Sequence, residues 1–442
     1  MSSARATTYY LRSFGCQMND HDAERIAGML QQLGMSACGT PEEARVLVYN
    51  TCSIREKADS RLAGHLGLAA RLKREDRDRL VVVAGCLAQS RREDLIREYP
   101  FVDVLVGPQS LHELPRLLRE RTRSGRWAGA LQEATTRWSA DLPRARAQGP
   151  CAWVQVMTGC TNFCSYCIVP HVRGPEASRS AEDVIKEVES LAASGVREVT
   201  FLGQNVNAYG KECGFKGRTT FPDLLRQACR VGGLERVRFM TSHPKDVSQE
   251  LIELMGQPNQ VCEHIHLPVQ SGSDHVLEAM RRQYDREAYV QLVQRWRQAV
   301  PGLAVTTDLI VGFPGETEDD FEATVSLVEV CAFDGAFTFV YSPRKDTEAA
   351  GLSGRIDAGT AAKRMGRLVE VVHRVGRERN QALVGKVVEV LVERVSRHGD
   401  QEVMGRTRTH KPVNFASDAS PGDLVQVEVT AATSTSLRGT EA

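Results

Sequence analysis

Three cysteines lie close together in the segment GCTNFCSYC, namely Cys160, Cys164 and Cys167. Clustered thiolates bind zinc or iron–sulfur clusters, and both usually take four protein ligands. Zinc sites prefer paired Cys-x-x-Cys spacings, of which this segment has only one, so zinc would need a distant partner such as His171. An iron–sulfur cluster held by three cysteines instead leaves one iron open to an exchangeable group. The spacing therefore favours a cluster with one open position.

A second set of three cysteines follows three short apolar segments near the start of the chain. Cys16 comes one residue after TTYYLRSF, Cys52 after RVLVYNT and Cys86 after LVVVAG. With VDVLVG, these segments predict buried parallel strands, because the stretches between them (DAERIAGMLQQLG, SRLAGHLGLAARLK and REDLIREY) have helical spacing. The carboxyl ends of parallel strands open onto one edge of a sheet, so we expect the three thiols to converge in one crevice.

Six further strand and helix units are predicted downstream of these segments. The strands are CAWVQVMT, REVTFLG, RVRFMTS, EHIHLPV, LAVTTDLIV and GAFTFVYS. The alternation is typical of a partial TIM-like (βα)6 barrel, whose chemistry gathers at the carboxyl ends of the strands, and the cysteine loop follows the first strand. Helix caps are predicted at Ser180 with Asp183 and at Thr317 with Asp320, and a glycine cap at Gly195.

The length of 442 residues is too great for one hydrophobic core. We predict an α/β protein with four parts: an open parallel α/β sheet over residues 1–120, a linker over 121–149, the (βα)6 barrel over 150–375, and a small antiparallel β-barrel over 376–442. The linker is rich in Arg, Gly and Pro. An RNA contact through its arginines, Trp127 and Trp138 is the alternative interpretation.

The composition fits a soluble globular protein, with 42% apolar and 25% charged residues. The sequence has no apolar run near the ~20 residues that span a membrane and no signal-peptide pattern, so we predict a cytoplasmic protein. In that reducing compartment, clustered cysteines indicate metal or redox chemistry rather than disulfides. The net charge of zero argues against a protein that coats nucleic acid non-specifically, although it permits a local basic patch.

The segment GCTNFCSYCIVP resembles the signature of the radical S-adenosylmethionine (SAM) superfamily. The resemblance implies that Cys160, Cys164 and Cys167 hold a 4Fe-4S cluster. It also implies that the amino and carboxylate groups of SAM occupy the open iron.

Nearly the whole chain resembles the methylthiotransferase family within that superfamily. FGCQMNDHDAERI, NTCSIREKA and AGCLAQ resemble its amino-terminal domain, and residues 384–440 resemble its RNA-binding TRAM domain. This implies a second 4Fe-4S cluster on Cys16, Cys52 and Cys86. QMN and SIREKA are closest to the branch that acts on isopentenyladenosine in tRNA. PHVRG replaces the common PYTRG, and the usual Pro-Gly turn after Arg344 is absent, but neither change removes a cluster ligand.

The resemblance implies an enzyme that methylthiolates isopentenyladenosine at tRNA position 37, beside the anticodon. Carbon-2 of adenine bears an unactivated C–H bond, so a cofactor must carry the hard step. SAM would be both radical source and methyl donor, and the second cluster would present the sulfur. The implied partners are the tRNA anticodon loop, a reductase or flavodoxin-type electron donor and an iron–sulfur cluster carrier, with no membrane contact. The protein is expected to be a monomer.

Three alternatives remain open at this point. The same machinery could act on threonylcarbamoyladenosine in tRNA or on an aspartate of a ribosomal protein. The third alternative is a zinc-stabilised RNA-binding protein without catalysis. The other six cysteines share no ligand spacing and are predicted to be small buried hydrophobic residues; they are Cys38, Cys151, Cys213, Cys229, Cys262 and Cys331.

Polar residues near the ends of the barrel strands are candidates for binding SAM, because ligands bind at this end of such barrels. They are Gln204, Asn205, Ser242, Gln270, Ser271 and Asp308, with Gly312 just after the fifth strand. The alternative is that they only close turns or satisfy backbone groups. His243, before a proline, is predicted to be structural, and Glu316 to stabilise the next helix through its dipole.

Arg406, Arg408 and Lys411 lie close together in GRTRTHKPVNF, with Phe415 near. Such a set can neutralise phosphates and stack on a base, so we predict that it binds RNA. An ordinary charged strand face is the alternative.

Overall fold

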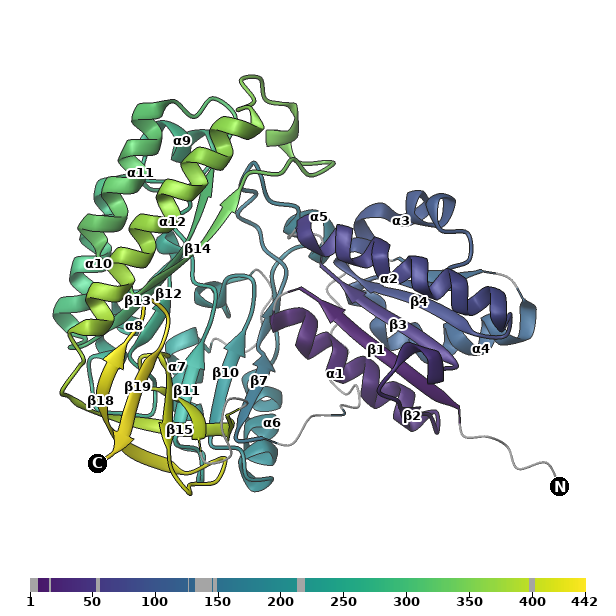
Figure 1. Ribbon diagram of the computed structural model, residues 1–442, viewed down its shortest axis with the longest axis horizontal. Coiled ribbons are helices and arrows are strands. Elements are labelled where there is room, and N and C mark those ends of the chain that lie inside the picture. Colours follow the sequence, from purple (N-terminus) through teal and green to yellow (C-terminus); the bar gives the residue numbers. More distant parts are fainter. Residues whose placement is uncertain are drawn as a thin grey trace. The chain divides into compact units, whose positions relative to one another are not determined.

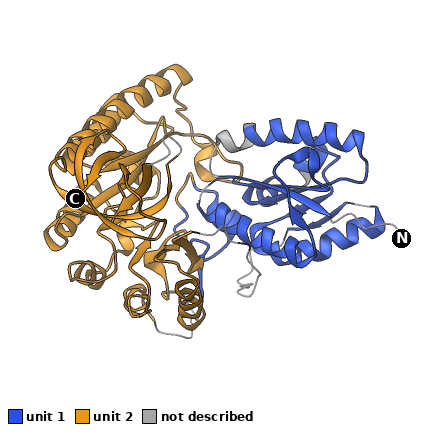
Figure 2. Cartoon of the chain, turned by 60° about the horizontal axis from the view of Figure 1, so that its bottom comes forward, with its two compact units in different colours: residues 1–147, 158–163, 167–179 blue, residues 148–157, 164–166, 180–442 orange. Residues whose placement is uncertain are grey.

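A computed structural model describes residues 7–15, 17–52, 56–125, 127–131, 145, 149–212, 219–396 and 402–442. Cys16, Trp138 and Cys213 lie outside the described residues. The chain divides into two units, shown in Figure 2: residues 1–147, 158–163 and 167–179 form the first, and residues 148–157, 164–166 and 180–442 the second. Cys160 and Cys167 thus belong to the first unit and Cys164 to the second.

The first unit is built on a parallel sheet with strand order β2-β1-β3-β4-β5-β6 (Figure 1). Its strands are β1 (Thr8–Phe14), β2 (Ser36–Ala37), β3 (Val46–Thr51), β4 (Leu80–Gly85), β5 (Val104–Val106) and β6 (Ala128–Ala130). Its helices are α1 (Gln17–Gln32), η1 (Pro41–Glu43), α2 (Glu56–Glu75), α3 (Cys86–Glu98), η2 (Pro108–Glu113) and α4 (Leu114–Ser124). The predicted open parallel α/β sheet is confirmed.

Alternation along the strands builds a core on each face of this sheet. Leu47 and Tyr49 of β3 pack in the core that contains apolar side chains of α2 and α3. Val46 and Val48 point the other way, into the core that contains side chains of α1 and α4. Both faces are therefore covered by helices, which explains why the strands read as continuous apolar runs.

The predicted linker starts too early. Residues 121–124 finish α4, which ends at Gly125 with a left-handed φ of +66°, and β6 pairs with β5 at the edge of the sheet. The three small residues of β6 give no strand pattern that sequence reasoning could use. Trp127 is 46% exposed beside this strand.

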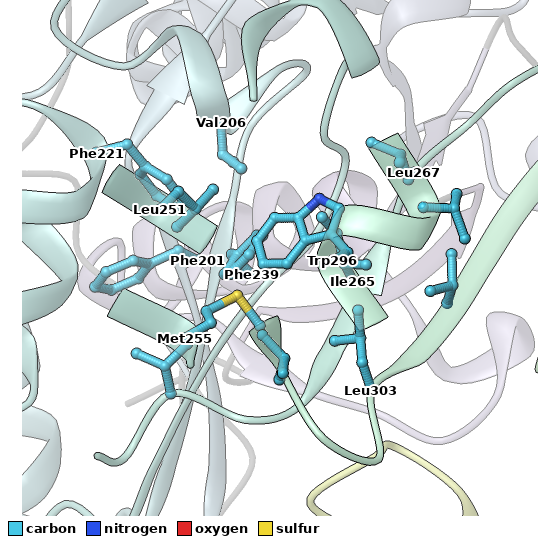
Figure 3. Packing of buried hydrophobic residues seen from close by; sticks show 14 of the residues in the cluster. Phe201, Val206, Phe221, Phe239, Leu251, Met255, Ile265, Leu267, Trp296 and Leu303 are labelled. Carbon is cyan, nitrogen blue, oxygen red and sulfur yellow. The ribbon is translucent and has the colours of Figure 1, made fainter. Parts of the chain in front are cut away.

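The second unit contains six parallel strands that follow one another in chain order. They are β7 (Cys151–Gln155), β10 (Glu198–Leu202), β11 (Arg236–Phe239), β12 (His264–His266), β13 (Ala304–Val311) and β14 (Gly335–Val340). They pair as β7-β10-β11 and β12-β13-β14, and a parallel bridge between Val237 and Val261 connects the two sets. The predicted (βα)6 barrel is confirmed. Trp296 is wholly buried in its core, close to Phe239 and Ile265 (Figure 3).

Helices connect these strands where the sequence predicts them. They are α6 (Ala181–Ala193), α7 (Phe221–Ala228), α8 (Gln249–Met255), α9 (Asp274–Ala279), α10 (Arg286–Ala299) and α11 (Glu318–Cys331), with the 3-10 turns η3 (Val206–Ala208), η4 (Pro244–Asp246) and η5 (Glu348–Gly351). The predicted caps are confirmed: Ser180 accepts from the Asp183 N–H, Thr317 forms a capping box with Asp320, and Gly195 has a φ of +92°.

Helix α12 (Ala358–Gln381) leads into a closed five-stranded barrel. Its strands are β15 (Val387–Val395), β16 (Glu402–Thr407), β17 (Pro412–Ala416), β18 (Leu424–Ala432) and β19 (Leu437–Glu441). The predicted boundary at 376 falls inside α12, and β19 was not predicted because LRGTE lacks an alternating pattern. The barrel is also not wholly antiparallel, since β17 and β19 pair in parallel. No helix in the described part of the chain has the length and apolarity that crossing a membrane requires.

Two buried arginines of β11 attach the small barrel to the (βα)6 barrel. Arg236 donates to the carbonyl of Arg406 at 2.7 Å, and Arg238 donates to the carbonyls of Thr407 at 2.7 Å and Arg408 at 2.6 Å. The Glu198 carboxylate lies 2.9 Å from Nε of Arg238. Because these carbonyls end β16 and begin the next turn, the bonds fix that strand against β11.

A stack of two imidazoles lies at the same junction and should make stability depend on pH. The rings of His264 and His410 have centroids 5.0 Å apart, and burial lowers the pKa of both well below the ordinary 6.5. Below pH 6.5 the unfolded chain takes up protons that the folded chain does not. We therefore expect the free energy of unfolding to fall as pH drops through this range, by about 1.4 kcal/mol per pH unit for each histidine. Thermal unfolding of wild type and His410→Phe across that range should show a shallower pH dependence in the variant; equal slopes would contradict this.

Candidate cluster and cofactor site

The cysteine loop is irregular backbone between β8 (Met157–Thr158) and helix α5 (Val169–Arg173), and β9 (Ala177–Ser178) follows that helix. Gly159 opens the loop with a φ of +77°, and a Cβ there would lie 1.9 Å from the carbonyl oxygen of Pro175. The N–H of Cys160 donates to the carbonyl of Gly174 at 3.0 Å. The loop is therefore closed on itself by a glycine that no other residue could replace without moving the backbone.

Cys164 is the most buried thiol of the loop, at 8% exposed, while Cys160 and Cys167 are half-buried. Nη1 of Arg282 donates to the Cys164 sulfur at 3.4 Å. The thiol that sequence spacing assigned to the cluster thus has a cationic donor on its sulfur.

The amino-terminal cysteines lie at adjoining strand ends, as predicted for the two that the structure describes. Cys52 follows β3 and donates its N–H to the carbonyl of Phe14, the last residue of β1, at 3.0 Å, and Cys86 begins α3 directly after β4. Both are 1% exposed. Cys16, next to Gly15 at the end of β1, lies outside the described residues.

Two glycines allow these strand ends to approach so closely. A Cβ on Gly15 would lie 2.7 Å from Cβ of Cys52, and a Cβ on Gly85 would lie 2.4 Å from the carbonyl oxygen of Thr51. Gly85 also has a φ of +94°. Any larger residue would push the thiol-bearing segments apart.

Within the first unit, Cys86 lies beside the segment that follows Cys167. It shares a small core cluster with Ile168, the next residue after Cys167, and with Val172 of α5. Arg173, at the end of α5, pairs with Asp22 of α1 at 3.0 Å, and both side chains are buried. Helix α5, which follows the cysteine loop, thus contacts both α1, which follows Cys16, and α3, which begins at Cys86.

The residues present fit iron–sulfur clusters by type, spacing and surroundings. Three thiols lie in a short loop, and two buried thiols lie at strand ends that only glycines bring together. Among the described residues, no three His, Cys, Asp or Glu side chains already converge to enclose one metal ion. The fit to iron–sulfur clusters therefore rests on the type, spacing and burial of the cysteines, and not on side chains already arranged around a metal ion.

Two of the predicted SAM residues present polar atoms without a protein partner. Oε1 of Gln204 and Oγ of Ser242 are buried and have no hydrogen-bond partner among the described residues. They follow β10 and β11, at the carboxyl ends where a ligand is expected. Asp308, on β13, is partly exposed, and its carboxylate lies 3.4 Å from Nε2 of His266. Unpaired buried polar atoms are costly, so these positions fit a polar ligand such as SAM.

The other predicted SAM residues take part in the protein's own hydrogen bonding. Asn205 accepts from the N–H of His243 at 3.2 Å and donates to Asp246 at 2.7 Å. Ser271 is fully buried against the hydroxyl of Thr324 at 3.2 Å. Gln270 exchanges backbone hydrogen bonds with β13, at a φ of +79°. Their predicted SAM contacts stay predictions, and the side-chain bonds of Asn205 and Ser271 favour the turn-closing alternative.

Three family models match the chain. Residues 154–328 match the radical SAM superfamily, residues 8–107 match uncharacterized protein family UPF0004, and residues 381–440 match the TRAM domain. The tRNA-2-methylthio-N(6)-dimethylallyladenosine synthase of Moorella thermoacetica is 45% identical over 98% of this chain and 98% of its own. The synthase of that name from Clostridium botulinum strain Loch Maree is 44% identical over 98% of this chain and 96% of its own.

The chain belongs to the family of these synthases. Solved structures agree on the fold. The radical SAM methyltransferase TsrM from Kitasatospora setae has a TM-score of 0.59 at 15% identity, covering 78% of this chain and 77% of its own. The cobalamin-dependent SAM radical enzyme OxsB has a TM-score of 0.51 at 12% identity, covering 84% and 56%.

The basic residues predicted to bind RNA in the TRAM domain are paired with carboxylates. Arg406 lies 2.8 Å from Glu393, Arg408 lies 2.7 Å from Glu263, and Lys411 lies 2.9 Å from Asp334. The partners of Arg408 and Lys411 belong to the (βα)6 barrel, so these two cations help dock the TRAM domain. Their RNA contact stays a prediction, and the observed pairing counts against it for both.

Sequence reasoning missed two candidate functional residues, Asn207 and Arg282. Both polar side-chain atoms of Asn207, in η3 directly after β10, are buried without a partner among the described residues. Arg282 lies far along the chain from Cys164, which it contacts. Asn207 stands in the same QNVN segment as Gln204, so its place after a strand end could have indicated it.

Burial raises the thiol pKa of the described cysteines outside the two triads, which makes them poor nucleophiles, while Cys213 lies outside the described residues. Burial raises the pKa of the Cys262 and Cys331 thiols to about 11, and both are buried as predicted. Cys38, Cys151 and Cys229 are half-buried, and burial raises the pKa of each.

Glu316, predicted to stabilise the next helix, is buried and also contacts α12. It pairs with Arg364 of α12 at 2.8 Å and accepts a hydrogen bond from the Gly312 N–H. It therefore anchors α12 and does not serve the next helix alone.

The buried Asp22–Arg173 pair should be a main support of the fold around the cysteines of the first unit. We expect Arg173→Met to destabilise α1 by roughly 3–5 kcal/mol, because it leaves a buried carboxylate without its partner. Hydrogen exchange of α1 peptides, followed by mass spectrometry, measures this. The matched control is Arg116→Met, which breaks the exposed ion pairs of Arg116 with Glu113 and Glu120 in the same unit and should leave the exchange of α1 nearly unchanged. Equal effects of the two changes would show that the buried pair has no special role.

Proposed function

We propose that this chain converts N6-dimethylallyl (isopentenyl) adenosine at tRNA position 37 to its 2-methylthio derivative. The structural observation that carries the proposal is the packing of Cys86 against Ile168 and Val172. It sets a cysteine of the amino-terminal triad beside the segment that carries Cys167. Two neighbouring three-thiol sites are what a reaction needs that both generates a radical and delivers sulfur to one base. The relatives named as synthases of this product support the same reaction.

Each triad would hold one 4Fe-4S cluster, with Cys160, Cys164 and Cys167 on the first and Cys16, Cys52 and Cys86 on the second. When bound, the first cluster and SAM supply an electron and a 5′-deoxyadenosyl radical, which is chemistry that side chains alone lack. The protein's own contribution is to orient these groups, to exclude water and to position the base.

The orphaned polar atoms at the barrel strand ends suit the recognition of SAM. The amide oxygen of Gln204 can accept from a hydroxyl or ammonium group, and the hydroxyl of Ser242 can donate or accept. Asp308 adds a carboxylate on strand β13 of the same barrel. These three residues are the SAM contacts that we propose in preference to Asn205 and Ser271.

The TRAM domain supplies the RNA contact, and the base must leave its stack to be reached. Reduction of the first cluster needs an external one-electron donor, which we propose to be a reductase or flavodoxin-type protein. An iron–sulfur carrier would renew the second cluster. A tRNA substrate is consistent with a cytoplasmic location.

The iron content tests the two-cluster proposal. Anaerobically reconstituted wild type should hold about eight irons, and the Cys160→Ala/Cys164→Ala/Cys167→Ala and Cys16→Ala/Cys52→Ala/Cys86→Ala variants about four each. Iron and sulfide analysis with Mössbauer spectra measures this, and Cys262→Ala/Cys331→Ala serves as the matched control that should keep all irons. Full iron in the amino-terminal variant would reduce the protein to a one-cluster enzyme. Roughly two zinc ions without iron would favour the zinc-stabilised binding protein.

The substrate is tested by product mass. We expect wild type with SAM and a reductant to add a methylthio group to tRNA that carries isopentenyladenosine, and to leave tRNA lacking the isopentenyl group unchanged. Nucleoside mass spectrometry detects the product, and the loop-triad variant is the inactive control. A methylthio mark on threonylcarbamoyladenosine, or on ribosomal protein alone, would overturn the proposed substrate while leaving the cluster chemistry intact.

A further inference from the structure

Arg282 is a buried cation whose hydrogen bonds direct it at a cysteine of the loop triad. It is 7% exposed, in the turn between α9 and α10. Nη2 donates to the carbonyl of Pro268 at 2.8 Å, Nε donates to the hydroxyl of Tyr284 at 2.7 Å, and Nη1 donates to the sulfur of Cys164 at 3.4 Å. Two corners of the planar guanidinium are thus held by fixed oxygens, which leaves the third to face the sulfur.

The partners that hold this guanidinium are themselves fixed. The Tyr284 hydroxyl donates to the carbonyl of Val269 at 2.9 Å, and the Arg282 guanidinium lies 5.1 Å from the centroid of the Tyr284 ring. The Tyr284 ring also packs against the His243 ring, with centroids 5.7 Å apart. Arg282 therefore cannot turn from the sulfur without breaking several buried bonds.

Arg282 lacks the counter-charge that a buried cation normally has. Within the described residues, its hydrogen bonds go to a carbonyl, a phenol and a thiol sulfur, and no carboxylate pairs with it. A buried charge without a partner is strongly unfavourable. By contrast, Arg238 and Arg364 of the same unit each pair with a glutamate. The negative charge that Arg282 faces is therefore to be sought at Cys164.

We propose that Arg282 sets the reduction potential of the cluster on Cys160, Cys164 and Cys167, through its hydrogen bond to the Cys164 sulfur. The inference rests on the proposed function for the presence of that cluster. One-electron reduction adds one negative charge to the cluster, and a cation fixed beside a ligand sulfur in a low-dielectric site favours the reduced form. Arg282 is thus a positioning residue that makes the cluster easier to reduce.

The test is a potentiometric titration of the reconstituted full-length protein, followed by EPR of the reduced cluster. It uses the Cys16→Ala/Cys52→Ala/Cys86→Ala background, so that one cluster titrates. We expect Arg282→Met to make one-electron reduction about tenfold less favourable, a fall of about 59 mV in midpoint potential. Arg282→Lys, which keeps the charge, should recover at least half of the shift.

The matched control is Arg286→Met. Arg286 also donates to backbone carbonyls in this unit, those of Gly272 at 3.2 Å and Ala323 at 2.5 Å, but its hydrogen bonds among the described residues include none to Cys160, Cys164 or Cys167. Its removal should leave the midpoint potential unchanged. An unchanged potential in Arg282→Met with full iron would overturn the proposal. Absence of iron in the parent protein would instead overturn the proposed function.

A second measurement needs no variant and so does not depend on the folding of Arg282→Met. Wild-type protein labelled with 15N only in arginine should show a 15N coupling to the reduced cluster by electron–nuclear double resonance. It should also show a proton coupling that disappears in D2O. A reduced cluster without any arginine 15N coupling would overturn the proposal regardless of how the variants behave.

Discussion

The rest of the site depends on the contact between Cys86 and the helix that follows the cysteine loop. Ile168 and Val172 bury the start of α3, so the strand-end crevice and the loop share one small apolar cluster. This apolar cluster is small, and it is supplemented by the buried Asp22–Arg173 pair and by the hydrogen bond from Gln109 to the Arg173 carbonyl. Apolar packing thus brings Cys86 beside the segment that follows Cys167, and buried polar bonds fix the position of α5 in the first unit.

The attachment of the TRAM domain uses a different balance of forces. Its contact with the (βα)6 barrel is dominated by charged groups, since Arg236 and Arg238 donate to backbone carbonyls, and Arg408 and Lys411 meet Glu263 and Asp334. Directional bonds of this kind permit one orientation, whereas an apolar contact tolerates sliding. The basic residues that the sequence offers for RNA are therefore partly used to hold the domain, and the RNA surface must draw on other groups.

Periodicity in the sequence predicted the elements that bury apolar faces, and it failed where burial leaves no pattern. The strands of both sheets were found because runs such as LVVVAG can only be buried, whereas AGA in β6 and LRGTE in β19 are too short or too polar to stand out. Thiol spacing indicated the loop triad, and positions at the ends of predicted strands indicated the amino-terminal one. Spacing could not show that Lys411 faces Asp334, because that pairing depends on how two domains meet, 77 residues apart in the chain.

Strand β11 shows how one element serves stability at one end and chemistry at the other. At its start, Arg236 and Arg238 satisfy carbonyls and carboxylates, so the charge they bury is compensated inside the fold. Past its other end, Ser242 buries a hydroxyl without a partner among the described residues. Folding alone gains nothing from such a group, because an unpaired buried hydroxyl costs about 1–3 kcal/mol. The same holds for Gln204 and for the cation of Arg282, all at the carboxyl side of the barrel strands. The buried polar atoms of Gln204 and Ser242, which have no partner among the described residues, therefore indicate a ligand-binding role for the carboxyl ends of the strands, where ligands bind in such barrels. The hydrogen bonds of Arg236 and Arg238 instead hold the TRAM domain.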